Sequence, residues 1–365
     1  MWKGKHLARP RHVPIRRPLV LLAGLVSLAL HTAYAVEPPR PDQENFISRA
    51  VFDGQRLWLR SDAGALSTVA PGETVLTKAD LPDLALDVCA AAGVVQALTC
   101  PRGACSIWTL RRKTEGRWTT VATVRAAGDT VAALNCAPDG RTVTLTNRRL
   151  IEFVSGVPIA RRLSQQIRTG TVTSTHVTPE HVFVGVNAGE WGGGLRRIDR
   201  KTGRVSQIEK AGKDLCEGPL NTACDPVNAI TDDPWKPGCV LAAIGLVHFS
   251  PHGRIVQVCG NDVRRIYFRG LGNARPRKPT EHDDEPFETE AFFGIARAGM
   301  QIVAVGVDGI YRFDAAGPPL RTPLPSFEPI GGIEVSFATA DVILVLTGIN
   351  QRRSISGNVP LLVPR

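Results

Sequence analysis

The segment from residue 187 to 194, NAGEWGGG, carries the side chains best suited to contact a ligand. It holds Asn187, Glu190 and Trp191 together with four glycines. An indole offers a flat apolar face and one N–H donor, and Asn and Glu offer directional hydrogen bonds. Glycine lets a ligand approach the backbone closely. This combination suits a sugar ring or a peptide side chain. The alternative is that Trp191 covers a neighbouring element and the glycines only make the turn.

A second candidate segment runs from 211 to 228, AGKDLCEGPLNTACDPVN. A disulfide between Cys216 and Cys224 would hold it in one shape, and a stapled loop loses less entropy when it binds a partner. Alternatively, the disulfide only protects a long secreted loop. We predict that Asn221 and Asp225 in this segment contact the ligand.

Catalytic chemistry has little support. The paired acids Asp232 and Asp233 are sequence neighbours, which usually point into water when they lie on a turn, whereas an acid–base pair must converge in space. The sequence has no G-x-S-x-G, H-E-x-x-H or Walker motif and no calcium-loop pattern. The cysteine spacings do not match paired zinc ligands. We therefore predict no catalytic residue, no metal site and no cofactor.

The elements that position these loops follow a repeat. A β-rich run is followed by a short turn and then by two apolar residues three positions apart. The pairs are Leu66 and Val69, Ile107 and Leu110, Leu150 and Phe153, Leu195 and Ile198, Leu246 and Phe249, and Ile310 and Phe313. Their first members are 41, 43, 45, 51 and 64 residues apart.

A drifting period of about 40 to 50 residues is typical of β-propeller blades of four strands. We predict an all-β fold, a single propeller over residues 44–365 with seven four-stranded blades; six or eight blades are the alternatives. A two-sheet sandwich pair explains the strands but not the period. The polar, proline-rich stretch 269–286 is predicted to be a surface loop inserted between blades five and six.

The first 35 residues are predicted to be a secretory signal peptide. They are basic and contain no acid, with a twelve-residue apolar run at 19–30 and an A-x-A site ending at Ala35. An uncleaved anchor is the alternative. Residues 36–43 would form a short linker. Without residues 1–35 the chain has 38 basic and 34 acidic residues, a net charge of +4. This charge is too small to favour binding to nucleic acid by electrostatic attraction.

Eight cysteines behind a signal peptide predict disulfides. Cys100 and Cys105 flank a four-residue turn, Cys216 and Cys224 share one loop, and Cys89 and Cys136 occupy equivalent ends of neighbouring inner strands. Cys239 and Cys259 remain by elimination, although the predicted strands put them at opposite ends of one blade. A link from Cys259 to Cys216 or Cys224 is the alternative pairing.

The segments GLVHFSPHGRI and GIYRFDAAG resemble the repeat of two-component-regulator-type propellers, in which a strand leads into G-L-x-x-[FY]-[DSN] and a turn. The resemblance covers six repeats, and it implies a bacterial, extracytoplasmic, ligand-binding propeller.

The expected function is that of an exported, noncatalytic propeller, periplasmic or secreted and monomeric. It would bind a small molecule, a glycan or an envelope protein on the face formed by the loops between second and third strands and between blades. No transmembrane segment is expected after signal cleavage. One alternative is a propeller enzyme acting on an extracytoplasmic polysaccharide or similar polymer, and another is a scaffold in an envelope assembly.

Overall fold

The computed structural model describes residues 47–324, except 71–72, 74–75, 104, 138, 214–215, 249 and 272–287, together with 333–337, 342–347 and 361–364. The predicted signal peptide (1–35), the linker (36–43) and most of the insertion at 269–286 lie outside these residues. No helix among the described residues is long and apolar enough to cross a membrane.

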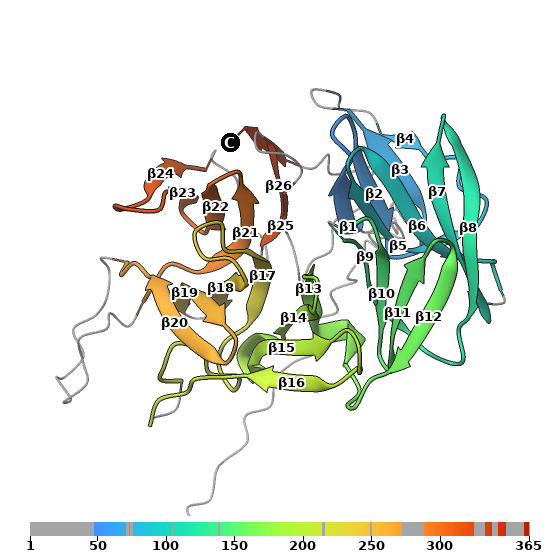
Figure 1. Ribbon diagram of the computed structural model, residues 1–365. Coiled ribbons are helices and arrows are strands. Elements are labelled where there is room, and N and C mark those ends of the chain that lie inside the picture. Colours follow the sequence, from blue (N-terminus) through green and yellow to red (C-terminus); the bar gives the residue numbers. More distant parts are fainter. Residues whose placement is uncertain are drawn as a thin grey trace, which may run out of the picture. The chain divides into compact units, whose positions relative to one another are not determined.

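Six four-stranded sheets follow one another along the chain, and each sheet pairs its strands in sequence order (Figure 1). The first three comprise β1 (Ile47–Phe52), β2 (Leu57–Ser61), β3 (Leu66–Val69), β4 (Thr77–Lys78); β5 (Leu84–Ala91), β6 (Val94–Cys100), β7 (Ile107–Thr114), β8 (Arg117–Arg125); and β9 (Val131–Cys136), β10 (Thr142–Thr146), β11 (Arg149–Val154), β12 (Val157–Arg162). The next three comprise β13 (Val172–Val177), β14 (His181–Asn187), β15 (Gly193–Asp199), β16 (Val205–Ile208); β17 (Val227–Asp232), β18 (Cys239–His248), β19 (Ser250–Cys259), β20 (Asp262–Tyr267); and β21 (Phe292–Ala298), β22 (Gln301–Gly306), β23 (Gly309–Phe313), β24 (Leu320–Pro323). Two short 3₁₀ turns, η1 (Thr169–Thr171) and η2 (Gly189–Trp191), lie in connections.

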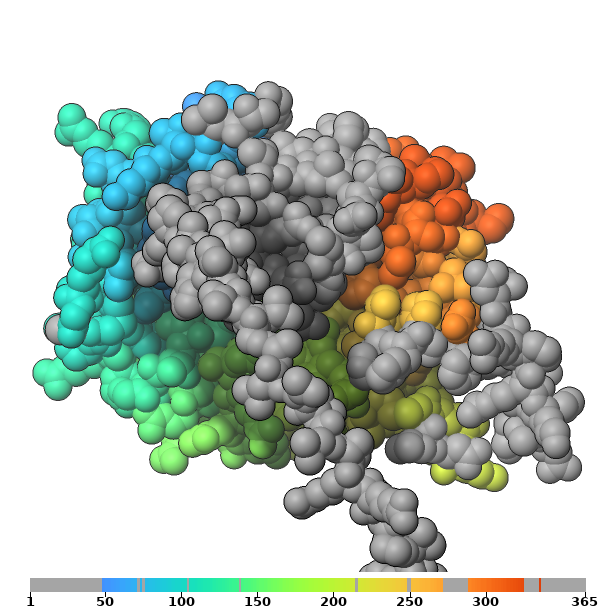
Figure 2. Space-filling view, turned by 180° about the vertical axis from the view of Figure 1, so that it is seen from behind, coloured from blue at the N-terminus to red at the C-terminus, as the bar shows by residue number. Residues whose placement is uncertain are grey.

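The first strand of each sheet contacts the first strand of the next, from β1 to β5, β9, β13, β17 and β21. Strand β25 (Ile333–Phe337) contacts both β21 and β1 and so returns this series to its start. Figure 2 shows the same succession of sheets from behind, from blue through green and yellow to orange. These contacts are those of a β-propeller with four-stranded blades, and they confirm the predicted fold class.

The predicted number of seven four-stranded blades is wrong for the described residues. Six sheets have four strands, and β25 with β26 (Val342–Thr347) and β27 (Leu361–Pro364) forms a three-stranded sheet. The sequence pattern had already weakened there, because the C-terminal strands carry only a degenerate form of the repeat. We therefore describe six blades, numbered in chain order.

The apolar core lies between successive blades. Blades four and five share one cluster that joins Phe183 and Leu195 to Val240, Ala242 and Ile244. Each fully buried Val, Leu, Ile or Phe side chain contributes about 1.5–3 kcal/mol. The second strands are covered on both faces, and all five residues of β10 are buried, for example. The loops at the blade ends are therefore carried by a rigid base.

The third strand of blade five was misplaced by the sequence pattern. Leu246 lies in β18, and the GLVHFSPHG segment spans the hairpin between β18 and β19. The equivalent apolar pair is Ile255 and Val258, both fully buried in β19. Two ten-residue strands make this hairpin longer than the others. Leu195, Ile255 and Ile310 are then 60 and 55 residues apart, so the connection before blade five also lengthens the period.

All four predicted disulfides are present: Cys89–Cys136, Cys100–Cys105, Cys216–Cys224 and Cys239–Cys259. The objection to the last pair was wrong, because Cys239 begins β18 and Cys259 ends β19, and antiparallel pairing places them opposite each other with Cα atoms 4.5 Å apart. Disulfides form and persist in oxidising compartments, which indicates an extracytoplasmic location.

Candidate functional site

Trp191 projects from the connection between β14 and β15, and its side chain is 81% exposed. Asn187, the last residue of β14, shapes this connection: its Oδ1 accepts a hydrogen bond from Gly189 N at 2.8 Å, and its Nδ2 donates to Asn228 Oδ1 at 2.8 Å. Gly189 adopts φ +64°, a conformation that favours glycine. The exposed indole is therefore carried on a turn that its own sequence defines.

The glycines after Trp191 make room for the protein's own chain. The backbone N–H of Gly193 donates to Thr222 O at 3.0 Å, and that of Gly194 donates to Asp225 O at 2.7 Å. A Cβ on Gly193 would collide with Val186 O and crowd Asp225 O. The close approach is thus made by the segment 211–228 that contains the Cys216–Cys224 disulfide, which lies beside the Trp191 turn.

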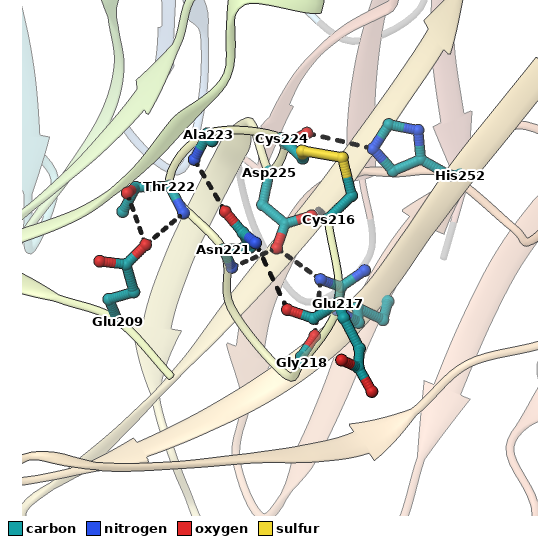
Figure 3. The surroundings of a disulfide bond; sticks show 11 residues. Glu209, Cys216, Glu217, Gly218, Asn221, Thr222, Ala223, Cys224, Asp225 and His252 are labelled. Carbon is teal, nitrogen blue, oxygen red and sulfur yellow. Dashed lines mark hydrogen bonds and ion pairs between the residues drawn. A yellow bond between two sulfur atoms is a disulfide. The ribbon is translucent and has the colours of Figure 1, made fainter. Parts of the chain in front are cut away.

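Asp225 holds the stapled loop to blade five. Its carboxylate is almost fully buried, pairs with the guanidinium of Arg254 and accepts a hydrogen bond from Asn221 N at 2.6 Å (Figure 3). Burial raises the pKa of Asp225, and the positive charge of Arg254 opposes this rise. The arginine also donates to Gly218 O at 3.0 Å, so one ion pair fixes both sides of the loop.

Asn221 is used inside the same loop. Its Oδ1 accepts from Ala223 N at 3.0 Å, and its Nδ2 donates to Glu217 O at 3.4 Å. The predicted ligand contacts of Asn221 and Asp225 stay predictions, but the amide of Asn221 and the Oδ2 atom of Asp225 already have partners within the chain. Their evident role is to hold the loop in shape.

Thr222 links the stapled loop to the outer strand of blade four. Its hydroxyl donates to Glu209 Oε1 at 2.7 Å and accepts from Gln207 Nε2 at 2.9 Å. The hydrogen bond from the hydroxyl lowers the pKa of Glu209, which keeps this carboxylate ionised. The loop is therefore fixed on one side by blade four, through the contact between Thr222 and Glu209 (Figure 3), and on the other by Arg254 of blade five.

Sequence reasoning missed a recurring acid. Asp129, Asp225 and Glu290 each lie two residues before the first strand of their blade, and all three carboxylates are buried. Asp129 accepts from Arg149 Nε at 2.5 Å, Asp225 pairs with the arginine described above, and Glu290 Oε1 accepts from Asp308 N at 3.0 Å. Each acid thus ties an inter-blade connection to the second hairpin of its own blade. The position of each acid two residues before a strand was visible in the sequence, but no sequence feature indicated that these carboxylates are buried.

The inner strands also hold a polar pair that the sequence did not reveal. His176 Nε2 of β13 lies 2.8 Å from Asp232 Oδ1 of β17. The hydrogen bond from His176 lowers the pKa of Asp232. Their 56-residue separation hid this contact. The polysaccharide-enzyme alternative expects acids or histidines gathered from several blades, and His176 and Asp232 join two of the blades that the structure describes.

Comparison with known proteins identifies the fold. No protein-family model matches the chain, and no curated protein matches its sequence. Similar solved structures include virginiamycin B lyase from Staphylococcus aureus, with a TM-score of 0.51, 12% identity and coverage of 84% of this chain and 93% of that one. YCF48 bound to D1 peptide gives a TM-score of 0.50 at 10% identity, with coverage of 83% and 89%.

The extracellular domain of a proposed one-component system of B. thetaiotaomicron is also similar, with a TM-score of 0.46 and 14% identity; 84% of this chain matches 38% of that one. Identities this low show the propeller fold alone, because one fold hosts many functions.

Proposed function

We propose that this protein is an exported, noncatalytic β-propeller that binds a protein partner through Trp191. The observation that carries the proposal is an indole left 81% exposed on a turn whose backbone is fixed by the neighbouring stapled loop. Fixing a contact residue before binding reduces the entropy lost in the complex. Tryptophans in such positions are prominent among the residues that dominate binding energy.

The hydrogen-bonding groups around Trp191 favour a protein over a glycan. A sugar is held by directional hydrogen bonds, yet the amide of Asn187 and the side chains of Asn221 and Asp225 are bonded within the chain. Apolar surface remains available: Val247, near the end of β18, is 54% exposed, and β18 contacts η2. Trp191 and Val247 together suit an apolar side chain of a partner. Glu190 would lie at the rim of this surface.

Export to the periplasm or the medium is part of the proposal. We propose that residues 1–35 direct export and are cleaved after Ala35. N-terminal sequencing of the exported protein should begin at Val36, and recovery of an intact Met1 would contradict cleavage.

A scaffold role is the second candidate, and strand β12 favours it. Val157 and Ile159 lie two residues apart on this outermost strand of blade three, and they are 60% and 41% exposed. Alternate residues share one face of a strand, so the two side chains form an exposed apolar strip. Exposed apolar strips on edge strands are candidate assembly surfaces.

The test places a photo-crosslinking amino acid at position 191 in the exporting cell and, as a control, at position 300. Met300 is 62% exposed in the turn between β21 and β22. A protein crosslinked from position 191 and not from 300 would then be purified and its affinity measured. Trp191→Ala should weaken binding by about thirtyfold, whereas Met300→Ala should not.

Stability measurements separate binding from packing. Loss of a side chain this exposed should change the free energy of unfolding by less than about 0.5 kcal/mol. Unchanged affinity in Trp191→Ala, or strong destabilisation of that variant, would refute the assignment of Trp191 to a binding surface.

A further inference from the structure

A polar cleft of about 510 Å³ lies at the outer part of the joint between blades four and five. Strands β14, β15 and β16 form most of it, and the turn between β19 and β20 closes one side. Its charged side chains are Arg197, Asp199, Arg204 and Glu209, and His181, Gln207 and Asn261 are its main neutral polar side chains. Neither Trp191 nor Val247 lines this cleft, so it is distinct from the proposed protein-binding surface.

The walls of the cleft are held in place by their own contacts. Arg197 reaches across the joint and donates to Gly260 O at 2.8 Å and to Asn261 Oδ1 at 2.9 Å. The Oδ1 atom of Asp199 accepts from the backbone N–H of Thr202 at 2.7 Å and from its hydroxyl at 2.8 Å. These contacts fix the two sides of the cleft before any ligand enters.

The charges that line the cleft balance. Two guanidiniums, of Arg197 and Arg204, face two carboxylates, of Asp199 and Glu209. Hydrogen bonds from Thr202 lower the pKa of Asp199, and Glu209 is kept ionised as described above, so both acids are charged at neutral pH. Burial and the nearby charge of Arg197 lower the pKa of His181, so its imidazole is uncharged at neutral pH. The lining therefore carries no net charge.

Both donors and acceptors remain available in the cleft. Among the described residues, no hydrogen bond or ion pair engages the guanidinium of Arg204 or the ring nitrogens of His181; the ring only packs beside Phe183 at 6.1 Å. The Nδ2 donor of Asn261 and the Oδ2 acceptor of Asp199 are not used by the contacts described above. A ligand that both donates and accepts at several points would satisfy this set.

We propose that this cleft binds a neutral saccharide of one or two rings. Sugar hydroxyls donate and accept at once, which matches the mixed lining, and a neutral ligand matches the balanced charge. Cavities of 300–1,000 Å³ are typical of small-molecule sites. No aromatic ring other than the imidazole lines the cleft, so the affinity should be weak, on the order of millimolar.

The test titrates the whole exported protein with maltose and with N,N′-diacetylchitobiose, and monitors saturation transfer by NMR together with calorimetry. Glucuronate and glucosamine serve as the acidic and basic comparisons. Arg204→Ala should weaken binding of the neutral sugar by about tenfold. Arg196→Ala is the matched control, because Arg196 lies on the other face of β15 and outside the lining.

Each result decides the proposal. Saturable binding of at least one neutral disaccharide, weakened in Arg204→Ala and retained in Arg196→Ala, supports it. Absence of saturable binding by both disaccharides up to about 50 mM overturns it, as does equal or tighter binding of either charged sugar, or an unaffected Arg204→Ala variant. Trp191→Ala should bind the sugar like the unaltered protein, so this test is independent of the proposed protein-binding function.

Discussion

Glu290 should contribute to the pH dependence of the propeller's stability, and Glu290→Gln should remove that contribution. This side chain is fully buried between blades five and six. One carboxylate oxygen accepts from Asp308 N, and the other, Oε2, has no hydrogen-bond partner among the described residues. Burial is the main cause that raises the pKa of Glu290, and the neighbouring Asp308 carboxylate adds to it; the pKa reaches about 7.

The sign follows from which state holds the proton more tightly. The folded pKa of about 7 exceeds the ordinary value of 4.5, so ionisation at Glu290 disfavours the folded state. The loss of folding stability caused by this ionisation is absent below pH 4.5, grows as the pH rises toward 7 and is constant above it. At about 1.4 kcal/mol per pKa unit, the lost stability above pH 7 is roughly 3 kcal/mol.

The measurement is urea unfolding with the disulfides intact, at about pH 5 and pH 8. Glutamine keeps the acceptor for Asp308 N without the charge, so Glu290→Gln should gain stability over the unaltered protein at pH 8 and little at pH 5. Glu115→Gln, at an exposed turn, should behave like the unaltered protein at both values. The reasoning fails if the free energies of unfolding of Glu290→Gln and of the unaltered protein differ by the same amount at both pH values, because Glu290 would then not titrate between pH 5 and pH 8.

Two further predictions concern the frame around Trp191 and the disulfides. Gly193→Ala should destabilise the protein by about 1–3 kcal/mol, because the added Cβ collides with Val186 O of the neighbouring strand and crowds Asp225 O. Gly170→Ala, which meets open space, should not. Equal melting temperatures for the two variants would show that the backbone around Gly193 is not closely packed. Peptide mapping without reduction should recover Cys239 joined to Cys259, and a link from Cys259 to Cys216 would contradict the register of β18 and β19.

The strand order and the positions of most blades follow from local sequence. Apolar residues recur there because the second strand of every blade is buried on both faces, and that requirement acts on each residue separately. The failure in blade five has the same origin: GLVHF and the run around Ile255 both satisfy the apolar spacing, and only pairing across the hairpin distinguishes them. The prediction of export also rests on local sequence, since charge, apolar length and cysteine number need no tertiary contact.

The chemistry of the loops was decided by tertiary structure alone. Asn221 and Asp225 have residue types suited to binding, yet their polar atoms are occupied by neighbours that the fold supplies, including an arginine 29 residues away from Asp225. Conversely, the cleft beside His181 and the contact between His176 and Asp232 join residues from different blades. Composition shows which groups a chain has, whereas burial and hydrogen-bond partners depend on segments that meet only after folding. For that reason the sequence could nominate Trp191 for binding, but only the structure could show that its side chain remains exposed.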